Sequence, residues 1–242
     1  MLQTILHKAN TRGSADHGWL KTNHTFSFAD YYDEARMHFG VLRVLNDDTI
    51  AGGTGFGTHG HSDMEIVTIP LSGSLAHNDS MGNSEVIHTG EIQVMSAGTG
   101  VRHSEFNADE SIPVSLLQIW IMPNKAGVTP RYQQIKLNRD DRENKIQQIL
   151  SPIETGGEVW IHQNAYFSLA NFEKGHSMNH ELKDPKNNGL YIFVISGQVK
   201  VNDQDLNTRD GYGVWDTDSV SIATLTALSD CEFLLIEVPM NS

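Results

Sequence analysis

The chain has 242 residues, of which 38 % are hydrophobic and 19 % are charged, a mix that suits a folded core and excludes a disordered chain. Its formal net charge of −13 repels phosphate backbones, so direct nucleic-acid binding is not expected. The single cysteine, Cys231, excludes an intramolecular disulfide, and no apolar run approaches membrane-spanning length. Residues 1–13 lack the apolar segment of a signal peptide, and we expect a cytoplasmic protein.

Short strand-like segments follow one another along the first half of the chain. Polar and apolar residues alternate in 25–28, and further apolar runs occupy 40–45, 66–71, 92–95 and 114–122. Turn-forming residues separate them at 46–48, 72–73, 81–83 and 97–100. Regular short strands with such turns predict a sandwich or a barrel.

A less apolar stretch, residues 124–152, interrupts this pattern. Residues 139–150 could form a short helix within it, and residues 150–153 are the expected junction between two halves.

The second half of the chain partly repeats the first. The apolar runs 66–73 and 190–197 both end in Ser-Gly, 89–95 is similar in character to 209–215, and 116–120 is similar to 234–238. Three matches in the same order, each offset by roughly 120 residues, predict a duplicated barrel. We therefore expect an N-terminal metal-binding domain at 1–125 with a linker to about 152, and a second domain at 153–242.

Two clusters of chemically active residues each hold an i, i+2 pair: His59 with His61, and His103 with Glu105. Residues two apart on a strand point to the same face, and neighbouring strands lie roughly 4.8 Å apart. If these two strands are neighbours, the four side chains meet inside a barrel. Three imidazoles and a carboxylate suit Fe(II), Mn(II), Ni(II), Cu(II), Co(II) or Zn(II), and leave two positions of a six-coordinate metal open.

The same residues also allow interpretations without a metal. A lone His-x-His is weak evidence, because surface histidines are common, and the chain has 12 histidines. The glycines at 53, 55 and 57 are not a dinucleotide-binding fingerprint, since no apolar strand runs into them and no helical pattern follows. The four-residue set with its glycine-rich flanks favours a metal site.

The sequence resembles the paired motifs of the cupins, and in detail it resembles pirin, a bicupin. Gly53-x5-His59-x-His61-x3-Glu65 matches the first motif, and Gly98-x4-His103-x3-Asn107 matches the second. The resemblance extends to His17-Gly18-Trp19-Leu20 and to residues 24–33, 42–48, 55–61 and 95–105. It is strongest to bacterial pirin-like quercetin 2,3-dioxygenases, and it implies an all-β fold of two tandem cupin (jelly-roll) β-barrels.

The resemblance also bears on which carboxylate binds the metal. In many cupins it is the glutamate of the first motif, here Glu65, whereas in pirins it comes from the second motif, here Glu105. Periodicity favours Glu105, which shares a strand face with His103, but the even offset of Glu65 from His61 does not exclude Glu65. We expect His59, His61, His103 and Glu105 as ligands and Glu65 nearby. Gly60 departs from the stiffer residue that is common between the two histidines in pirins.

The second half does not repeat the ligands. The equivalent positions without gaps are Lys183, Pro185, Ala223 and Leu225, none of which suits a metal. A shifted register could bring in His176 or His180, but without a His-x-Glu partner. We expect a degenerate second lobe without metal.

The resemblance implies a dioxygenase that opens the ring of quercetin-like flavonols with O₂ and releases carbon monoxide, with Fe(II) as the expected metal. Glu105 would be both ligand and base, and Phe56, Phe106 and Trp120 are candidate walls of a flat aromatic pocket, or ordinary barrel core. Gln118 could hydrogen-bond near the metal or cap a turn. The alternative is a metal-dependent, redox-responsive regulatory protein that binds a protein partner without turnover.

Overall fold

A computed structural model describes residues 2–152, 158–215 and 222–241 of the chain. These residues form strands almost throughout, with only short 3₁₀ helices between them, so the predicted all-β class is confirmed. The 3₁₀ helices are η1 (Ala9–Thr11), η2 (Glu34–Arg36) and η3 (Arg139–Asp141). None of the described residues belongs to a helix that is long and apolar enough to cross a membrane.

The first lobe contains a large and a small antiparallel sheet. In spatial order the large sheet consists of β12 (Arg131–Lys136), β9 (Glu91–Ser96), β6 (Glu65–Ser72), β11 (Val114–Ile121), β4 (Leu42–Ile50), β3 (Leu20–His24) and β2 (Gly13–Asp16). The small sheet consists of β5 (Gly55–His61), β10 (Val101–Asn107), β7 (Ser74–Asp79) and β8 (Ser84–His88).

The second lobe repeats this arrangement. Its large sheet consists of β1 (Gln3–His7), β20 (Gly211–Trp215), β17 (Asn188–Ser196), β22 (Cys231–Pro239), β15 (Tyr166–Phe172), β13 (Ile146–Ser151) and β14 (Val159–Trp160). Its small sheet consists of β16 (Ser177–Glu181), β21 (Ile222–Ala227), β18 (Gln198–Val201) and β19 (Gln204–Asn207). The order β9-β6-β11-β4 corresponds to β20-β17-β22-β15, and β5-β10-β7-β8 corresponds to β16-β21-β18-β19, so the predicted duplication into two cupin lobes is confirmed.

Matching turns accompany the matching strands. Gly73 follows β6 with φ 74°, and Gly197 follows β17 with φ 77°. Both glycines lie in the left-handed region, where a Cβ atom is unfavourable, and a Cβ at Gly197 would come 2.1 Å from the carbonyl oxygen of Asp230. The Ser-Gly pairs in the sequence therefore mark the same turn in the two lobes.

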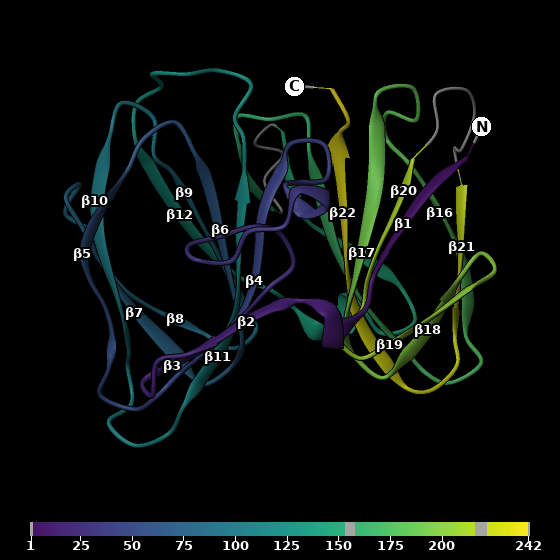
Figure 1. The fold of residues 1–242 in the computed structure, drawn as a ribbon, viewed down its shortest axis with the longest axis horizontal. Coiled ribbons are helices and arrows are strands. Elements are labelled where there is room, and N and C mark those ends of the chain that lie inside the picture. The colour runs from purple at the N-terminus through teal and green to yellow at the C-terminus, as the bar shows by residue number, and fades with distance from the viewer. Residues whose placement is uncertain (1, 153–157, 216–221, 242) are drawn as a thin grey trace.

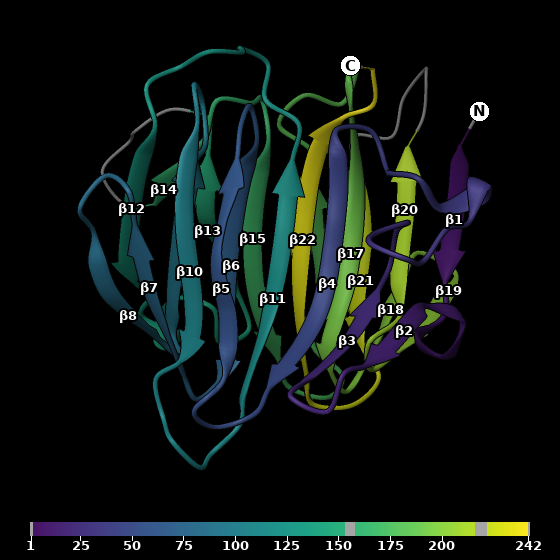
Figure 2. The ribbon, with the colours of Figure 1, turned by 60° about the vertical axis from the view of Figure 1, so that its left-hand side comes forward.

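The two large sheets pack face to face in the middle of the molecule, and the small sheets lie outside them (Figures 1 and 2). One continuous hydrophobic core joins Leu42 and Leu45 of β4 to Leu234 and Ile236 of β22. A second core fills the barrel of the second lobe. In the first lobe, two smaller apolar clusters leave room between the sheets for polar side chains.

Two strands lie across the division that was expected from the sequence. β1 comes from the N-terminus but pairs with β20, and in Figure 1 it lies among the strands of the second lobe. β13, residues 146–151, pairs with β15 of the second lobe, although it precedes the boundary at 153, which itself lies outside the described residues. His7 at the end of β1 holds this strand against the second lobe, because its Nδ1 lies 2.8 Å from the hydroxyl of Tyr191 in the buried core.

Three local predictions were wrong. Residues 25–28 lie between β3 and β4 and form no strand, and only Phe28 makes an isolated bridge, to Tyr31. Residues 46–48 are not a turn but lie inside β4, because Asn46 and Asp48 turn their polar side chains into the interior of the first lobe. Residues 139–150 form η3 and then β13 rather than one helix. Asn144 has φ 53°, which no α-helix accommodates, and Leu150 is buried by pairing opposite Phe167.

Candidate metal centre

Three histidines come together in the first lobe because β5 and β10 are antiparallel neighbours. His103 is directly opposite His59, and His61 is opposite Val101. Because side chains two residues apart on a strand point to the same face, all three rings lie on one face of the small sheet. The ring centroids of His59 and His103 are 4.4 Å apart, and His61 lies 4.9 Å from each. The Nε2 atoms of His61 and His103 are 3.0 Å apart.

Glu105 lies on the same side of β10 but further along the barrel. The pairing of β10 with β5 shifts register between His103 and Glu105, so that Glu105 is opposite Phe56. Gln118 of β11 donates its amide N–H to both carboxylate oxygens of Glu105, at 3.1 and 3.2 Å. Glu105 is 4 % exposed.

Burial sets the protonation of these groups before any metal arrives. Burial, assisted by the neighbouring His59, lowers the pKa of His61 to about 4. Burial and the neighbouring histidines lower the pKa of His103 to about 3. Burial raises the pKa of Glu105 to about 7, against the stabilising hydrogen bonds from Gln118. The rings of His61 and His103 are therefore neutral at physiological pH, which is the form that binds a metal.

The donor set fits a divalent transition metal. Two ligand nitrogens at about 2.05 Å from one ion and at a right angle to each other are about 2.9 Å apart. The observed separation of 3.0 Å between His61 and His103 is close to this value. A hydrogen bond between the two Nε2 atoms forms only if one of them carries a proton. When neither does, a cation between them can be bound by both lone pairs.

The described residues contain two groups of candidate ligands rather than one set of four. His59, His61 and His103 form the first group, and His77, His103 and Glu105 form the second. In each group the donor atoms lie within 4.8 Å of one another. His103 belongs to both, and His77 was not expected from the sequence.

The histidines open onto a cavity of ≈ 200 Å³ inside the first lobe. Phe28, Phe56, Ile66 and Trp120 form apolar walls. Trp120 lies edge-on to both His61 and Phe28, with ring centroids 5.0 and 5.3 Å apart. An apolar space beside polar groups is the usual form of a small-molecule site.

Polar side chains line the same cavity. Asn46, Asp48 and Gln118 join Glu105 there. Burial raises the pKa of Asp48 to about 7, and its Oδ1 makes no hydrogen bond among the described residues. Thr68 donates its hydroxyl to the amide oxygen of Gln118 at 3.1 Å, which fixes the orientation of the amide that holds Glu105.

The residues expected to line a pocket divide into two sets. Phe56, Gln118 and Trp120 line the cavity. Phe106 does not, and the expectation for it was wrong: it alternates with the inward Glu105 along β10 and is 41 % exposed. Glu65 does not line it either: it is the first residue of β6, an inner strand of the large sheet, and accepts a 2.7 Å hydrogen bond from the hydroxyl of Ser96.

The sequence analysis missed Phe28, Asn46, Asp48 and His77. The alternation of Asn46 and Asp48 along β4 was a signal for an inward polar face, but the same residues also suit a turn. His77 is followed by Asp79 at i+2, which is the spacing of the ligand pairs themselves.

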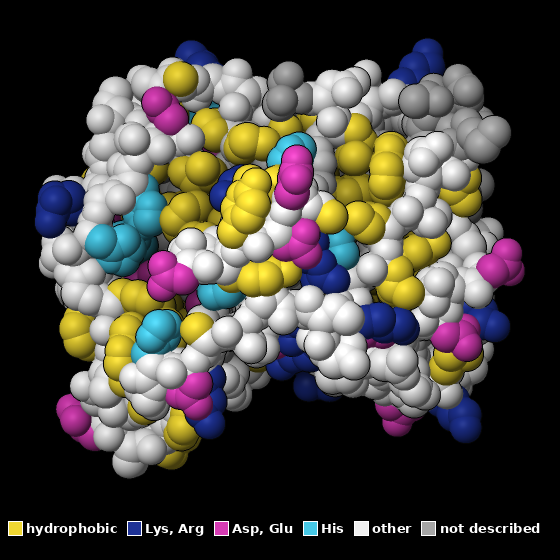
Figure 3. Space-filling model, viewed as in Figure 1, with side chains coloured by type: hydrophobic (Ala, Val, Ile, Leu, Met, Phe, Trp, Pro, Cys, Tyr) yellow, Lys and Arg dark blue, Asp and Glu magenta, His cyan; other side chains and the backbone are white. Residues whose placement is uncertain are grey.

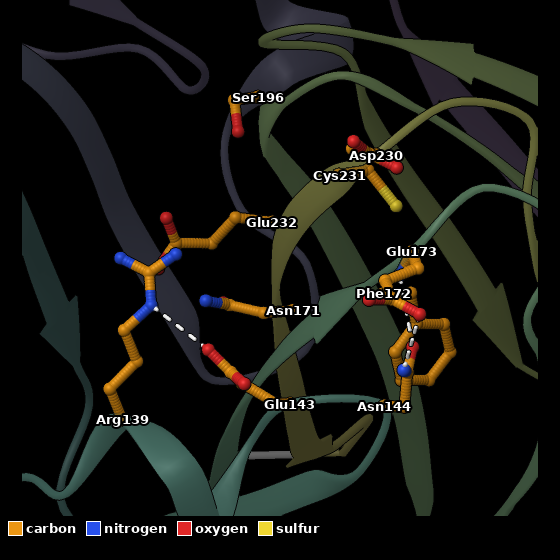
Figure 4. A pocket seen from close by; sticks show the side chains of 10 residues that line it. All are labelled: Arg139, Glu143, Asn144, Asn171, Phe172, Glu173, Ser196, Asp230, Cys231 and Glu232. Carbon is orange, nitrogen blue, oxygen red and sulfur yellow. Dashed lines mark hydrogen bonds and ion pairs between the residues drawn. The ribbon is translucent and has the colours of Figure 1, made fainter.

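A larger cavity of ≈ 290 Å³ lies in the second lobe near the end of β22. Figure 4 shows that its polar side chains pair largely with each other: Arg139 with Glu143 at 3.5 Å, and Asn144 with Glu173 at 3.1 Å. No histidine lines it, and Cys231 on its wall has a pKa raised by burial to about 11. It therefore lacks the groups that the first cavity offers for metal binding.

In the second lobe, the strands that correspond to β5 and β10 are β16 and β21. His180 is opposite Ala223, and Met178 is opposite Leu225. Ala223 and Leu225 are buried in the hydrophobic core of that lobe. Figure 3 accordingly shows histidine side chains gathered on the other lobe, at the left of the view.

Similarity to known proteins extends over both lobes. The sequence model of the pirin family matches residues 6–121, and that of the quercetinase C-terminal cupin domain matches residues 148–238. The chain is 46 % identical to a quercetin 2,3-dioxygenase of Escherichia coli K12 over 97 % of this chain and 98 % of the relative. It is 40 % identical to a pirin-like protein of Caulobacter vibrioides over 93 % of this chain and 95 % of the relative.

A solved structure is similar along nearly the whole chain. The crystal structure of the Escherichia coli bacterial pirin YhhW in complex with nickel(II) superposes with a TM-score of 0.91 and 43 % identity, covering 98 % of this chain and 99 % of that one.

Proposed function

This chain belongs to the pirin family, and from that premise we propose that it is a metal-dependent quercetin 2,3-dioxygenase. The reaction opens the heterocyclic ring of quercetin-like flavonols with O₂ and releases carbon monoxide. The observation that carries the proposal is the convergence of three imidazoles and a buried carboxyl on an apolar cavity. Relatives of the same length that share 45–46 % of the sequence are named for this activity. A cytoplasmic location is part of the proposal.

His59, His61, His103 and Glu105 would hold the metal, and Fe(II) is the ion that we propose for the cell. Imidazole and carboxylate donors with open positions suit ferrous chemistry with O₂, although the same set accepts nickel, manganese, cobalt, copper and zinc. When bound, the ion supplies Lewis acidity toward the hydroxyl and carbonyl oxygens of the flavonol and brings redox activity to the site.

The protein's own contribution begins with binding. Trp120 and Phe56 offer flat apolar surface to an aromatic ring system, and Phe28 and Ile66 close the cavity beside them. The cavity of ≈ 200 Å³ is smaller than the roughly 300 Å³ at which drug-sized sites begin, so the hydroxy-carbonyl end enters and the remaining ring extends toward the mouth. This orientation places the reacting oxygens beside the histidines and excludes water from them.

Glu105 is placed to take the proton of the flavonol hydroxyl. It lines the cavity next to His103, and Gln118 holds both of its oxygens. A carboxyl group in fixed orientation, reached by substrate but shielded from water, is suited to act as a general base. Asn46 and Asp48 can hydrogen-bond the remaining hydroxyl groups of a polyhydroxylated substrate.

The first experiment measures O₂ uptake and carbon monoxide release by iron-reconstituted protein with quercetin, beside His59→Ala prepared in the same way. Uptake with carbon monoxide release in the native protein alone supports the proposal. A native protein that binds one metal per chain but consumes no O₂ contradicts it, and favours a metal-dependent protein-binding role without turnover.

A further inference from the structure

We propose that His77, held by Asp79, is a positioning residue that selects the tautomer in which His103 presents Nε2 to the metal. Neither residue was part of the expected ligand set. The inference rests on the metal site proposed above, and it assigns a role to a buried His–Asp pair that the reaction itself does not require.

The pair is placed by strand register. β7 and β10 are antiparallel neighbours, with Asp79 opposite His103 and His77 opposite Glu105. The two i, i+2 pairs therefore face each other crosswise on the inner side of the small sheet. The rings of His77 and His103 have centroids 5.3 Å apart.

Asp79 is a buried anion with a complete set of donors. Its carboxylate accepts hydrogen bonds from the backbone N–H of Met81 and of Asn83 and from the side-chain amide of Asn83, at 2.8–3.0 Å. These bonds and the one from His77 hold the pKa of Asp79 below its usual value, against the effect of burial. Asp79 is therefore ionised, and in its contact with His77 it can only accept a hydrogen bond.

This acceptor fixes the proton on His77. Nε2 of His77 lies 3.0 Å from Oδ2 of Asp79, and both side chains are fully buried. Since Asp79 cannot donate, Nε2 of His77 carries a hydrogen, and in the ring with a single N–H this leaves Nδ1 with its lone pair. That Nδ1 is buried and makes no hydrogen bond among the described residues.

His103 has the complementary requirement. Its Nε2 faces His61 at 3.0 Å, in the metal group, so the ring binds metal only if its proton is on Nδ1. Nδ1 of His103 is also buried and also lacks a partner among the described residues. The Nδ1–H of His103 and the Nδ1 lone pair of His77 thus belong to neighbouring buried rings. In a buried environment, each polar atom without a hydrogen bond is costly.

The same residues could be read as a second metal site, because His77, His103 and Glu105 form a compact group. The position of His77 opposes that interpretation, because His77 is not among the residues that line the cavity, whereas His103 and Glu105 are. Nε2 of His77 is already engaged by Asp79. A positioning role uses all of these contacts.

The test compares Asp79→Asn with the native chain in two measurements. Asparagine can donate to Nε2 of His77, which moves the His77 proton to Nδ1 and turns a donor toward His103. Imidazole ¹⁵N NMR of the metal-free full chain, with His103 assigned by its loss in His103→Gln, should show the Nδ1–H tautomer in the native protein and a shift toward Nε2–H in Asp79→Asn. The dissociation constant for Ni(II), measured calorimetrically, should rise about 10–100-fold, with one ion still bound at saturation.

Two further variants separate positioning from ligation and from loss of folding. His77→Gln keeps an N–H for Asp79 and a carbonyl oxygen for His103, and should bind Ni(II) within about threefold of native, whereas His77→Leu should bind as weakly as Asp79→Asn. Asp109→Asn is the matched control, because Asp109 also caps a turn through backbone N–H groups but contacts no histidine. Thermal unfolding of each metal-free variant identifies any that fail to fold.

An unchanged His103 tautomer and an unchanged Ni(II) affinity in Asp79→Asn would overturn the inference. So would His77→Gln binding as weakly as His77→Leu with altered ligand-field bands, because His77 would then be a ligand. If the native chain binds no Ni(II), the proposed function fails, while the tautomer measured without metal still decides the role of Asp79.

Discussion

The Nε2 atoms of His61 and His103 lie 3.0 Å apart, although 42 residues separate them in the sequence. Burial lowers the pKa of each ring, so both are neutral near pH 7, and a hydrogen bond between them requires one of the two Nε2 atoms to carry its ring's proton. Binding one ion needs the lone pairs of both Nε2 atoms, so metal binding should replace this hydrogen bond and move that proton to Nδ1 of the same ring.

His103→Ala should remove metal binding, because His103 is the one residue shared by both groups of candidate ligands. We expect less than about one tenth of an ion per chain after reconstitution, and no O₂ uptake with quercetin. Metal analysis after gel filtration provides the measurement, with His88→Ala as control, since His88 is exposed and its ring bonds to Ser74 and lies outside both groups of candidate ligands. Stoichiometric metal in His103→Ala would show that the ion is held elsewhere.

Trp120→Ala should weaken substrate binding while leaving the metal in place. Trp120 forms part of the apolar wall, and losing about 1.4 kcal/mol of ring contact raises KM for quercetin about tenfold. Steady-state kinetics on protein with verified metal content measure this. Phe106→Ala is the matched control, because Phe106 lies on the outer face of β10 and should not change KM. Equal effects of the two substitutions would contradict the cavity as the flavonol site.

Glu65→Gln should leave the metal bound and change how stability depends on pH. Burial raises the pKa of Glu65 to about 7, against the hydrogen bond from Ser96. Between about pH 4.5 and 7 the native state thus holds more protons than the unfolded state, so the free energy of unfolding falls as pH rises through this window. Above pH 7, the ionised side chain of Glu65 lowers the free energy of unfolding by on the order of 1–3 kcal/mol.

The measurement is urea unfolding of metal-free native and Glu65→Gln chains at pH 5, 6, 7 and 8. The native chain should lose stability relative to the variant as pH rises, and the difference should be complete by about pH 8. Parallel curves would mean that Glu65 is ionised throughout. Loss of metal from Glu65→Gln would instead make Glu65 the carboxylate ligand.

Removal of the metal should lower thermal stability, by an amount that grows with the logarithm of the free ion concentration relative to Kd. An ion present at 100 times its Kd stabilises the folded chain by about 2.7 kcal/mol, which corresponds to roughly 5–10 °C for a protein of this size. Differential scanning calorimetry with and without Ni(II) measures the shift. The shift should vanish in His59→Ala, and a shift that persists there would place the stabilising ion outside the histidine group.

Some features followed from the sequence alone. Alternation along 101–107 put His103 and Glu105 on one inner face, and the structure shows this pattern of burial. The duplicated Ser-Gly turns predicted two lobes, because the same left-handed glycine is needed wherever the same hairpin recurs. These are local properties, and a period of two or a positive φ can be recognised without knowing what lies across the barrel.

The tertiary structure decided the rest, because contact between strands depends on register and not on spacing along the chain. Phe56 and His59 differ by an odd number of residues, yet both line the cavity, since the register of β5 against β10 shifts between them. β1 lies in the second lobe because its pairing partner, β20, is there. Asn46 and Asp48 could have formed a turn, and His77 could have been an ordinary core residue. Only the folded chain shows that Asn46 and Asp48 face the cavity. It also shows that His77 lies between the carboxylate of Asp79 and the ring of His103.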